Sequence, residues 1–503
     1  MARRRSGGSF TGWMETSTRR LGRDTAIYAL AFVLQRAASF IMLPIYTRYF
    51  TTADYGVLQL LQTSVEVASI LFSAGITAGV HRFYFQDDST EHRNGVLGAS
   101  FVLLLGFNAV GGAALALAAP WVAEEFLGGA GATRLVRIAS ASFCLDALLT
   151  LPMLRFQAEQ RSMTYATLSV LRLVIQLTMN VLGVVVFDLG VEGILWSTLL
   201  THVVLGTALT YGMLRKIGLR FTRALLGHLY RFGLPYRLTA AGAFALTYGD
   251  RYFLEEHHGL AEVGVYSLAY QFGFLLMSLG PGPFHLAWDP QRFQLVKQPK
   301  EIRDREYARG FFFFALVVVT LAVGISVFVR PLLTLMSAPE FHRAADLVPL
   351  VLLAFLAQSF GEVMDFGIQV SGRTLLTSLA TFVAVVVIVG LYAWLIPSLG
   401  GTGAALATLG GFTVRGVLYR VFAEREYPID YRSGRAVLLV AIGGAVAGAV
   451  VLLAPQGLWN ELGVACVATG VYAALVLTLV MRPDERAATL AYARSLRGRL
   501  GAT

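Results

Sequence analysis

The chain has 503 residues, of which 56% are hydrophobic and only 14% are charged. Because a soluble domain carries about 25% charged residues, this composition excludes an ordinary soluble globular protein and indicates an integral membrane protein. The net charge of +10 could suggest a nucleic-acid partner. The basic residues lie between apolar segments, however, where they are typical of membrane orientation, so we expect no nucleic acid.

Residues 1–24 are polar and rich in arginine, with no apolar core followed by a small-residue cleavage site. We therefore expect a basic cytoplasmic tail that lies against anionic headgroups rather than a cleavable signal peptide. A second basic cytoplasmic tail is expected at residues 482–503. Cys144 and Cys466 lie inside apolar runs and indicate neither a disulfide nor a zinc site, so we expect no metal and no cofactor.

About fourteen apolar segments of helix-spanning length follow the N-terminal tail. They lack the period-2 alternation of barrel strands and exceed the length of such strands, so we predict an all-α integral membrane fold. The predicted spans cover residues 25–47, 56–80, 95–119, 135–157, 163–187, 192–214, 232–250, 261–285, 308–330, 345–369, 374–397, 402–422, 435–454 and 461–481.

The distribution of basic residues predicts the orientation of these spans. With the N-terminus in the cytoplasm and the spans alternating, most of the 41 Lys and Arg residues fall in cytoplasmic segments. The segments at 215–231 and 292–305 are strongly basic, whereas the loops assigned to the outer face are short and poor in base. We therefore predict that both termini are cytoplasmic.

A repeated stretch divides the chain into two halves. The sequence RYFTTADYGVLQL at residues 48–60 returns as RYFLEEHHGLAEVGVYSL at residues 251–268, with a different spacer. A second echo, LGxxGxxxxTL, occurs at residues 189–199 and again at 399–409. A spacing of about 200 residues is too long for a solenoid and indicates a duplicated lobe, which is the usual architecture of a transporter.

We predict two lobes of six spans each, at residues 25–214 and 232–422, joined by a cytoplasmic linker at residues 215–231. A further helix pair is expected at residues 435–481. Because each half contains an even number of spans, the two halves run in the same direction. Both copies of the RYF repeat are therefore expected on the same outer face, related by a pseudo-twofold axis along the membrane normal.

The stretch LPIYTRYFTTADYGV at residues 43–57 resembles the first joint of the polysaccharide transporter family. These are O-antigen-type flippases of lipid-linked oligosaccharides in the multidrug/oligosaccharidyl-lipid/polysaccharide (MOP) exporter superfamily. Residues 75–85, 154–162 and 231–253 also resemble that family. The resemblance implies two MATE-like six-helix lobes in a V around a central cavity, plus a C-terminal helix pair. It further implies a role in lipopolysaccharide or exopolysaccharide biosynthesis in a bacterial or archaeal cytoplasmic membrane.

Charged side chains inside spans are the candidate functional residues. Each costs about 2.5–3.5 kcal/mol on insertion scales, so such residues normally face a cavity or a partner. Arginine suits a pyrophosphate headgroup, because its planar fork donates two hydrogen bonds to phosphate oxygens and keeps its proton. The candidates are Arg36, Glu66, Asp146, Arg172 and His202 in the first lobe, and Arg237, Glu362, Asp365 and Arg415 in the second.

Two interpretations of the first six candidates are open. Arg36 and Glu66 could form a pair that holds two helices of one lobe together. Alternatively, Arg36, Arg172 and Arg237 line a cationic substrate cavity, to which Glu66 and the acidic and imidazole groups of the first lobe also belong. Arg237 lies near the start of its span, so it could also extend to inner-leaflet headgroups.

Glu362 and Asp365 lie one helical turn apart in the cytoplasmic third of the tenth span. Together with Arg415 they could couple transport to a proton or a sodium ion. They could equally cap Arg373 or the end of the eleventh span. The nearby Pro-Gly-Pro sequence at residues 281–283 breaks the eighth span, either as a hinge or as a helix terminus.

The leading hypothesis is a flippase that moves an isoprenoid-pyrophosphate-linked oligosaccharide from the inner to the outer leaflet by alternating access. Its expected partners are the lipid-linked glycan, membrane lipids, and glycosyltransferases and a glycan polymerase of the same pathway. One alternative is a cation or drug antiporter of the same fold, which would require an acidic cavity. Another is a membrane glycan polymerase or ligase, which would require a large outer loop with catalytic residues. We expect no enzyme and no catalytic residue.

Overall fold

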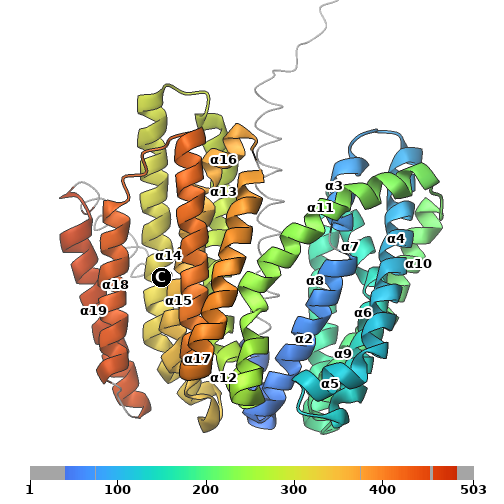
Figure 1. Ribbon diagram of the computed structural model, residues 1–503, viewed down its shortest axis with the longest axis horizontal. Coiled ribbons are helices and arrows are strands. Elements are labelled where there is room, and N and C mark those ends of the chain that lie inside the picture. Colours follow the sequence, from blue (N-terminus) through green and yellow to red (C-terminus); the bar gives the residue numbers. More distant parts are fainter. Residues whose placement is uncertain (1–39, 74, 374, 454–456, 484–485, 487–503) are drawn as a thin grey trace, which may run out of the picture. The chain divides into compact units, whose positions relative to one another are not determined.

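The structure is a computed structural model, and it describes residues 40–73, 75–373, 375–453, 457–483 and 486. These residues are nearly all helical and contain no strand, which confirms the predicted all-α fold (Figure 1). Arg36, the N-terminal tail and most of the C-terminal tail lie outside the described residues.

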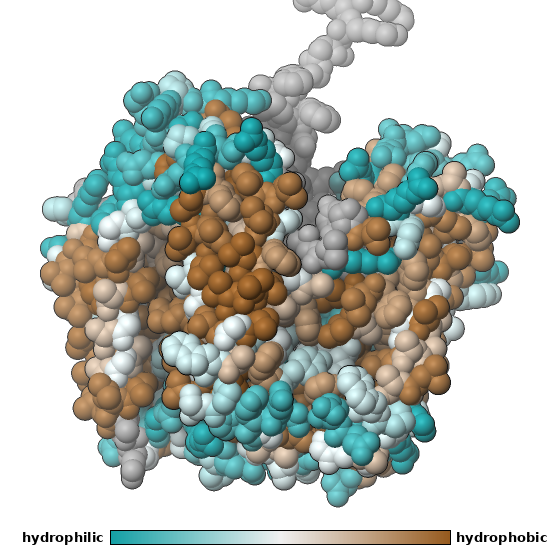
Figure 2. Space-filling model, viewed as in Figure 1, coloured by the Kyte–Doolittle hydropathy of each residue, from teal (hydrophilic) through white to brown (hydrophobic). Residues whose placement is uncertain are grey.

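Eleven helical segments in the described part of the chain are long and apolar enough to cross a membrane. Hydrophobic side chains cover the middle of the helices, and hydrophilic side chains gather at the two ends (Figure 2). Two of the eleven segments, Ala240–Asp289 and Leu375–Glu426, each cover two predicted spans. The first predicted span lies mostly outside the described residues, so the number fourteen stays a prediction.

The chain forms two compact units, Met1–Gly264 and Val265–Thr503, which we call unit 1 and unit 2. The predicted cytoplasmic linker at 215–231 is partly helical, since α11 begins at Arg223 and packs against helices of unit 1. The lobe boundaries derived from the sequence stay a prediction.

Unit 1 has a core of apolar side chains on helices α3, α4, α7 and α10. Its elements are α2 (Thr52–Phe72), α3 (Ile76–Tyr84), α4 (Thr90–Leu117), α5 (Ala119–Phe126), η1 (Ala130–Ala132), α6 (Thr133–Leu145), α7 (Ala147–Ala158), α8 (Ser162–Val181), η2 (Leu182–Val186), α9 (Gly190–Thr201), η3 (His202–Gly206), α10 (Thr207–Ile217), α11 (Arg223–Tyr248) and the first half of α12 (Asp250–Leu279).

The two copies of the RYF repeat pack against each other in unit 1. A Cβ atom built on Gly56 would lie 2.1 Å from the carbonyl oxygen of Leu260, and one built on Gly264 would lie 1.9 Å from that of Thr52. Gly56 and Gly264 occupy equivalent positions of the repeat. Only glycine permits this approach of α2 and α12, which explains why the repeat keeps a glycine at this point.

In unit 2, helices α14, α15 and α17 lie side by side, and α18 and α19 pack against α14 (Figure 1). Its elements are the second half of α12, α13 (Pro281–Leu295), α14 (Lys300–Met336), η4 (Pro339–Phe341), α15 (Ala344–Met364), α16 (Phe366–Ser371), α17 (Leu375–Glu426), α18 (Gly434–Leu453), α19 (Leu458–Leu475) and η5 (Val476–Val480).

The second sequence echo also has a backbone cause. Gly190, before the body of α9, and Gly400, at the kink of α17, both have φ = +55°. Side-chain-bearing residues adopt this left-handed region at a cost, so glycine is favoured at both turns. The kink at Gly400 separates the eleventh and twelfth predicted spans, and Gly259, with φ = +76°, similarly interrupts α12.

The Pro-Gly-Pro sequence at 281–283 ends one helix and starts another. Helix α12 stops at Leu279, and α13 begins at Pro281 and continues to Leu295. Proline is well suited to the first turn of a helix, where no intrahelical bond is needed from its nitrogen. The Pro-Gly-Pro sequence is therefore a helix terminus, one of the two alternatives, and the predicted span at 261–285 extends a few residues past the end of α12.

Candidate functional site

A close helix crossing organises the candidate site in unit 2. Helices α15 and α17 meet at Gly361 and Gly416, where a Cβ atom on Gly361 would lie 3.0 Å from the Cα of Gly416. Glu362 and Arg415 are the sequence neighbours of these glycines. The crossing therefore brings an acidic and a basic side chain from two helices to one place.

These side chains line a cavity of about 260 Å³ within unit 2. Seven residues surround it, and every one of them is polar or charged: His285, Arg292, Glu362, Asp365, Gln369, Arg415 and Tyr419. They come from α13, the α15–α16 corner and α17. The structure thus places Glu362, Asp365 and Arg415, the three residues considered for ion coupling, around one cavity.

Asp365 is held in place by hydrogen bonds. Its Oδ1 accepts from the Thr377 hydroxyl at 2.9 Å, and its Oδ2 accepts from Gln369 Nε2 at 2.9 Å. Thr377 lies on the first turn of α17, so Asp365 bonds to the start of the eleventh predicted span, whereas the expected alternative was its end. Arg373, the other expected partner, pairs instead with Glu426 at 2.7 Å.

Glu362 is only partly satisfied. Its Oε1 accepts from Gln358 Nε2 at 2.9 Å, whereas its Oε2 lies 4.0 Å from His285 Nε2. The other ring nitrogen of His285 lies 3.3 Å from Asp289 Oδ1. The His285 Nε2 atom is buried and has no hydrogen-bond partner among the described residues. One oxygen of Glu362 and one nitrogen of His285 therefore keep hydrogen-bonding capacity at the cavity.

Arg292 is anchored on one side. Its Nε lies 3.0 Å from Asp289 Oδ1, its Nη2 lies 3.5 Å from Gln369 Oε1, and its guanidinium stacks over the Phe366 ring at 4.5 Å. The Tyr307 hydroxyl donates to its backbone carbonyl at 2.7 Å. Its Nη1 is buried without a hydrogen-bond partner in the described structure. Arg292 is thus fixed in position with one donor left over.

Arg415 has fewer polar contacts than the other charged residues at the cavity. Its guanidinium carbon lies 5.1 Å from the Phe412 ring centre and 5.8 Å from that of Tyr419. Within the described ranges it makes neither a hydrogen bond nor an ion pair. Ring stacking orients an arginine without using its N–H donors, so Arg415 presents those donors to the cavity.

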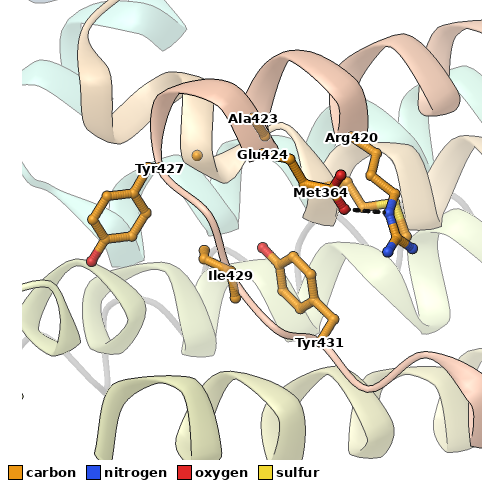
Figure 3. Close-up of a pocket in the computed structure, with 8 residues that line it drawn as sticks. Met364, Arg420, Ala423, Glu424, Tyr427, Ile429 and Tyr431 are labelled. Atoms are coloured by element: carbon orange, nitrogen blue, oxygen red, sulfur yellow. Dashed lines mark hydrogen bonds and ion pairs between the residues drawn. The ribbon is translucent and has the colours of Figure 1, made fainter. Parts of the chain in front are cut away.

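A smaller pocket lies beside this site and has a different character (Figure 3). It encloses about 10 Å³, which is room for one water molecule at most. Arg420 and Glu424, which line it, form an ion pair of 2.8 Å. Burial raises the pKa of the Tyr431 phenol, which also lines this pocket. We do not regard this pocket as a substrate site.

Three candidates from the first lobe form a cluster within unit 1. His202 Nε2 lies 3.6 Å from Asp146 Oδ1, and the Thr150 hydroxyl donates to Asp146 Oδ2 at 3.0 Å. Arg172 on α8 is half-buried and interacts electrostatically with Asp146. Gly206, one turn after His202, packs against Leu148, and this contact allows η3 and α7 to approach.

Arg36, Glu66 and Arg237 remain of the six candidates for the cationic substrate cavity. The described structure does not place them around one cavity. Arg237 on α11 stacks on two rings of unit 1, those of Phe107 at 4.8 Å and Tyr230 at 5.2 Å. Glu66 on α2 has an exposed side chain. Arg36 lies outside the described residues. The Arg36–Glu66 pair and the cavity of Arg36, Arg172 and Arg237 therefore stay predictions.

Sequence analysis did not select four of the cavity residues. They are His285, Arg292, Gln369 and Tyr419. Two signals in the sequence pointed to them. Gln369 and Tyr419 follow Asp365 and Arg415 by four residues, which is one helical turn. His285 comes just after the Pro-Gly-Pro break. The described residues contain no group of three or more His, Cys, Asp or Glu placed to hold a metal ion.

Residues 45–346, more than half of the chain, match the model of a family described as polysaccharide biosynthesis protein. The chain belongs to this family. A search of curated proteins finds no significant match. The family match confirms the resemblance to a polysaccharide-related family, and solved structures show which fold the chain shares.

Solved structures share the fold at low sequence identity. An inward-facing multidrug resistance MATE family transporter of the MOP superfamily aligns with a TM-score of 0.63 and 16% identity, over 82% of this chain and 98% of that chain. The lipid II flippase MurJ in an inward closed conformation aligns with a TM-score of 0.64 and 12% identity, over 92% and 99%. A MOP superfamily transporter from Pyrococcus furiosus gives 0.58 and 15%, over 83% and 96%.

Proposed function

We propose that this multi-pass membrane protein moves an isoprenoid-pyrophosphate-linked oligosaccharide, or a related polysaccharide precursor, from the inner to the outer leaflet. The family match to polysaccharide biosynthesis proteins supports a glycan-related role, and the fold is one that a lipid flippase and multidrug transporters use. The observation that carries the proposal is a polar, partly unsatisfied cavity among helices long enough to span a bilayer.

The physical problem of such a substrate is its polar head. A bare ion in hydrocarbon costs on the order of tens of kcal/mol, so the protein must replace the water around the pyrophosphate while the isoprenoid stays in the bilayer. Arginines do this best, because they stay charged and donate in pairs. We propose this role for Arg36, Arg172 and Arg237. Release outside follows when the lobes rock and the cavity opens outward.

The two alternatives have less support. A cation or drug antiporter needs an excess of acid at depth, but the cavity of unit 2 has two arginines beside its two carboxylates. A glycan polymerase or ligase has less support because the folds that match are those of transporters and a flippase. We propose that the protein is not an enzyme, that both termini are cytoplasmic, and that glycosyltransferases of the same pathway supply the substrate.

An export assay in cells tests the proposal. In a strain lacking the gene, the wild-type chain should restore surface glycan, and the Arg36→Ala, Arg237→Ala double variant should not, because two phosphate-binding groups are lost. Lysine at both positions should retain part of the export, since the charge remains and the planar fork is lost. Surface glycan and lipid-linked precursor are measured together, with the amount of protein in the membrane as the control.

Two outcomes would contradict the proposal. One is a gene deletion that leaves surface glycan unchanged. The other is the alanine double variant reaching the membrane at normal levels and exporting glycan at the wild-type rate. If the variant protein itself is lost, the arginines hold helices together, which is the other interpretation of these residues.

A further inference from the structure

The cavity of unit 2 is larger than an ion site needs. Its volume of about 260 Å³ far exceeds the roughly 10–15 Å³ that a single water molecule needs on the same measure. A dehydrated sodium ion would fill a small part of that space. A cavity of this size suits a small organic group such as a single sugar ring.

The chemistry of the lining also selects the ligand. Arg292 and Arg415 can only donate hydrogen bonds, Glu362 and Asp365 as carboxylates can only accept, and the other three residues can do both. A bare anion would use the donors and face two carboxylates. A bare cation would use the acceptors and face two guanidinium groups. A sugar hydroxyl both donates and accepts, so a polyhydroxylated ring can satisfy both kinds of group.

The groups that remain unsatisfied are spread around the cavity. The donors are Arg415 and Arg292 Nη1, and the acceptors are Glu362 Oε2 and His285 Nε2, which accepts when Nδ1 donates to Asp289. Two of these side chains are already held in position. Asp289 and Gln369 contact Arg292, and Gln358 donates to Glu362. Buried polar groups normally have partners, and Arg292 Nη1 and His285 Nε2 are buried without one in the described structure. These two atoms indicate an absent polar ligand, which the half-buried Arg415 and Glu362 side chains can also reach.

We propose that this cavity binds one sugar ring of the transported glycan through its hydroxyl groups. The inference rests on the proposed function and adds the substrate group that unit 2 recognises. Arg415 and Glu362, which the Gly361–Gly416 crossing brings together, supply the principal donor and acceptor. Asp365 and Gln369 extend the same surface along the α15–α16 corner. The cavity of unit 2 thus binds the carbohydrate, whereas the proposed cavity of Arg36, Arg172 and Arg237 binds the pyrophosphate.

Saturation-transfer NMR on the full-length protein in lipid nanodiscs tests this proposal, because the method detects weak binding of small molecules. The probes are glucose, N-acetylglucosamine and glucuronic acid, each added alone. We expect ring-proton signals from at least one sugar with the wild-type protein. Arg415→Leu and Glu362→Gln should each reduce them about fivefold or more, since each removes a hydrogen bond to the ligand.

Arg420→Leu is the matched control, because Arg420 lies on the same helix, is exposed and pairs with Glu424 at the small neighbouring pocket. Its sugar signal should equal that of the wild type. The conservative Glu362→Gln substitution keeps the shape of the side chain, so a lost signal in a folded variant is not a folding defect. Thermal unfolding of each variant checks this.

Three results would overturn the proposal. The first is that none of the sugars gives a signal with folded wild-type protein. The second is that the signal survives in both cavity variants. The third is that only ²³Na relaxation shows binding that depends on Glu362, which would make the cavity an ion site. Flipping of a lipid-linked glycan without a sugar signal would overturn this inference alone. Sugar binding without any glycan export would support the sugar site in the cavity but overturn the proposed function.

Discussion

The two units both place charged side chains among apolar helices, but they arrange them differently. In unit 1, Asp146 and His202 meet at 3.6 Å, and the histidine is buried. In unit 2, Glu362 and Arg415 stand at a cavity of about 260 Å³, and no described residue pairs with the arginine. In both places a glycine, Gly206 in one and Gly361 in the other, allows the helices to approach.

The difference separates two uses of an intramembrane charge. Groups that touch each other offset part of the cost of burial and hold their helices together. Groups that stand apart around open space keep their hydrogen bonds for a ligand. We therefore expect changes in the Asp146–His202 contact to affect stability first, and changes at Glu362 or Arg415 to affect binding first.

The largest effect should come from the helix crossing that builds the cavity. Gly361→Leu places a side chain 3.0 Å from the Cα of Gly416, so α15 and α17 must separate. Overpacking of this kind costs about 1–3 kcal/mol or more. We expect a lower unfolding temperature of the solubilised protein and loss of sugar binding. Gly390→Leu on α17 is the control, since nothing lies within 4 Å of its Cβ position. Equal unfolding temperatures for the two variants would show that the crossing is not tight.

A smaller effect should distinguish the two charge arrangements. Asp146→Ala leaves the Thr150 hydroxyl without its acceptor and removes the carboxylate 3.6 Å from the buried His202, which costs about 1–3 kcal/mol. Glu362→Ala removes the acceptor of Gln358 Nε2, and the side chain otherwise borders open space, so the change should cost about 1 kcal/mol or less while abolishing sugar binding. Denaturation of both variants in the same detergent measures the difference. A Glu362→Ala variant that is the less stable of the two would remove the distinction between the units.

The helices could be predicted from the sequence because the bilayer fixes the length of an apolar segment. The prediction of 435–454 matches α18 at Gly434–Leu453, and that of 163–187 matches α8 and η2 at Ser162–Val186. The two repeats could also be recognised in the sequence. The structure explains their shared glycines by close helix contact in one repeat and by a positive φ in the other. Boundaries were less accurate where a helix continues beyond the apolar stretch, as α13 does to Leu295.

The composition of the cavity could be predicted only in part. Glu362, Asp365 and Arg415 stood out because a charge inside an apolar span is rare. His285 and Arg292 did not, since they lie on a helix that the sequence places at the cytoplasmic edge, where charge is ordinary. Their role depends on side chains of α13 reaching those of α15 and α16 at the cavity, as Arg292 reaches Gln369. That proximity comes from tertiary packing, which a single sequence does not contain.

The transbilayer movement of a fluorescent isoprenoid-pyrophosphate oligosaccharide in proteoliposomes is the most direct test of the central claim. The wild-type chain should bring the labelled glycan to the outer surface, where an impermeant quencher reaches it, faster than it appears in empty liposomes. Arg415→Leu should slow this movement about fivefold or more, and Arg420→Leu should not, because only Arg415 faces the cavity. Equal rates in empty liposomes and in liposomes with folded wild-type protein would contradict the account.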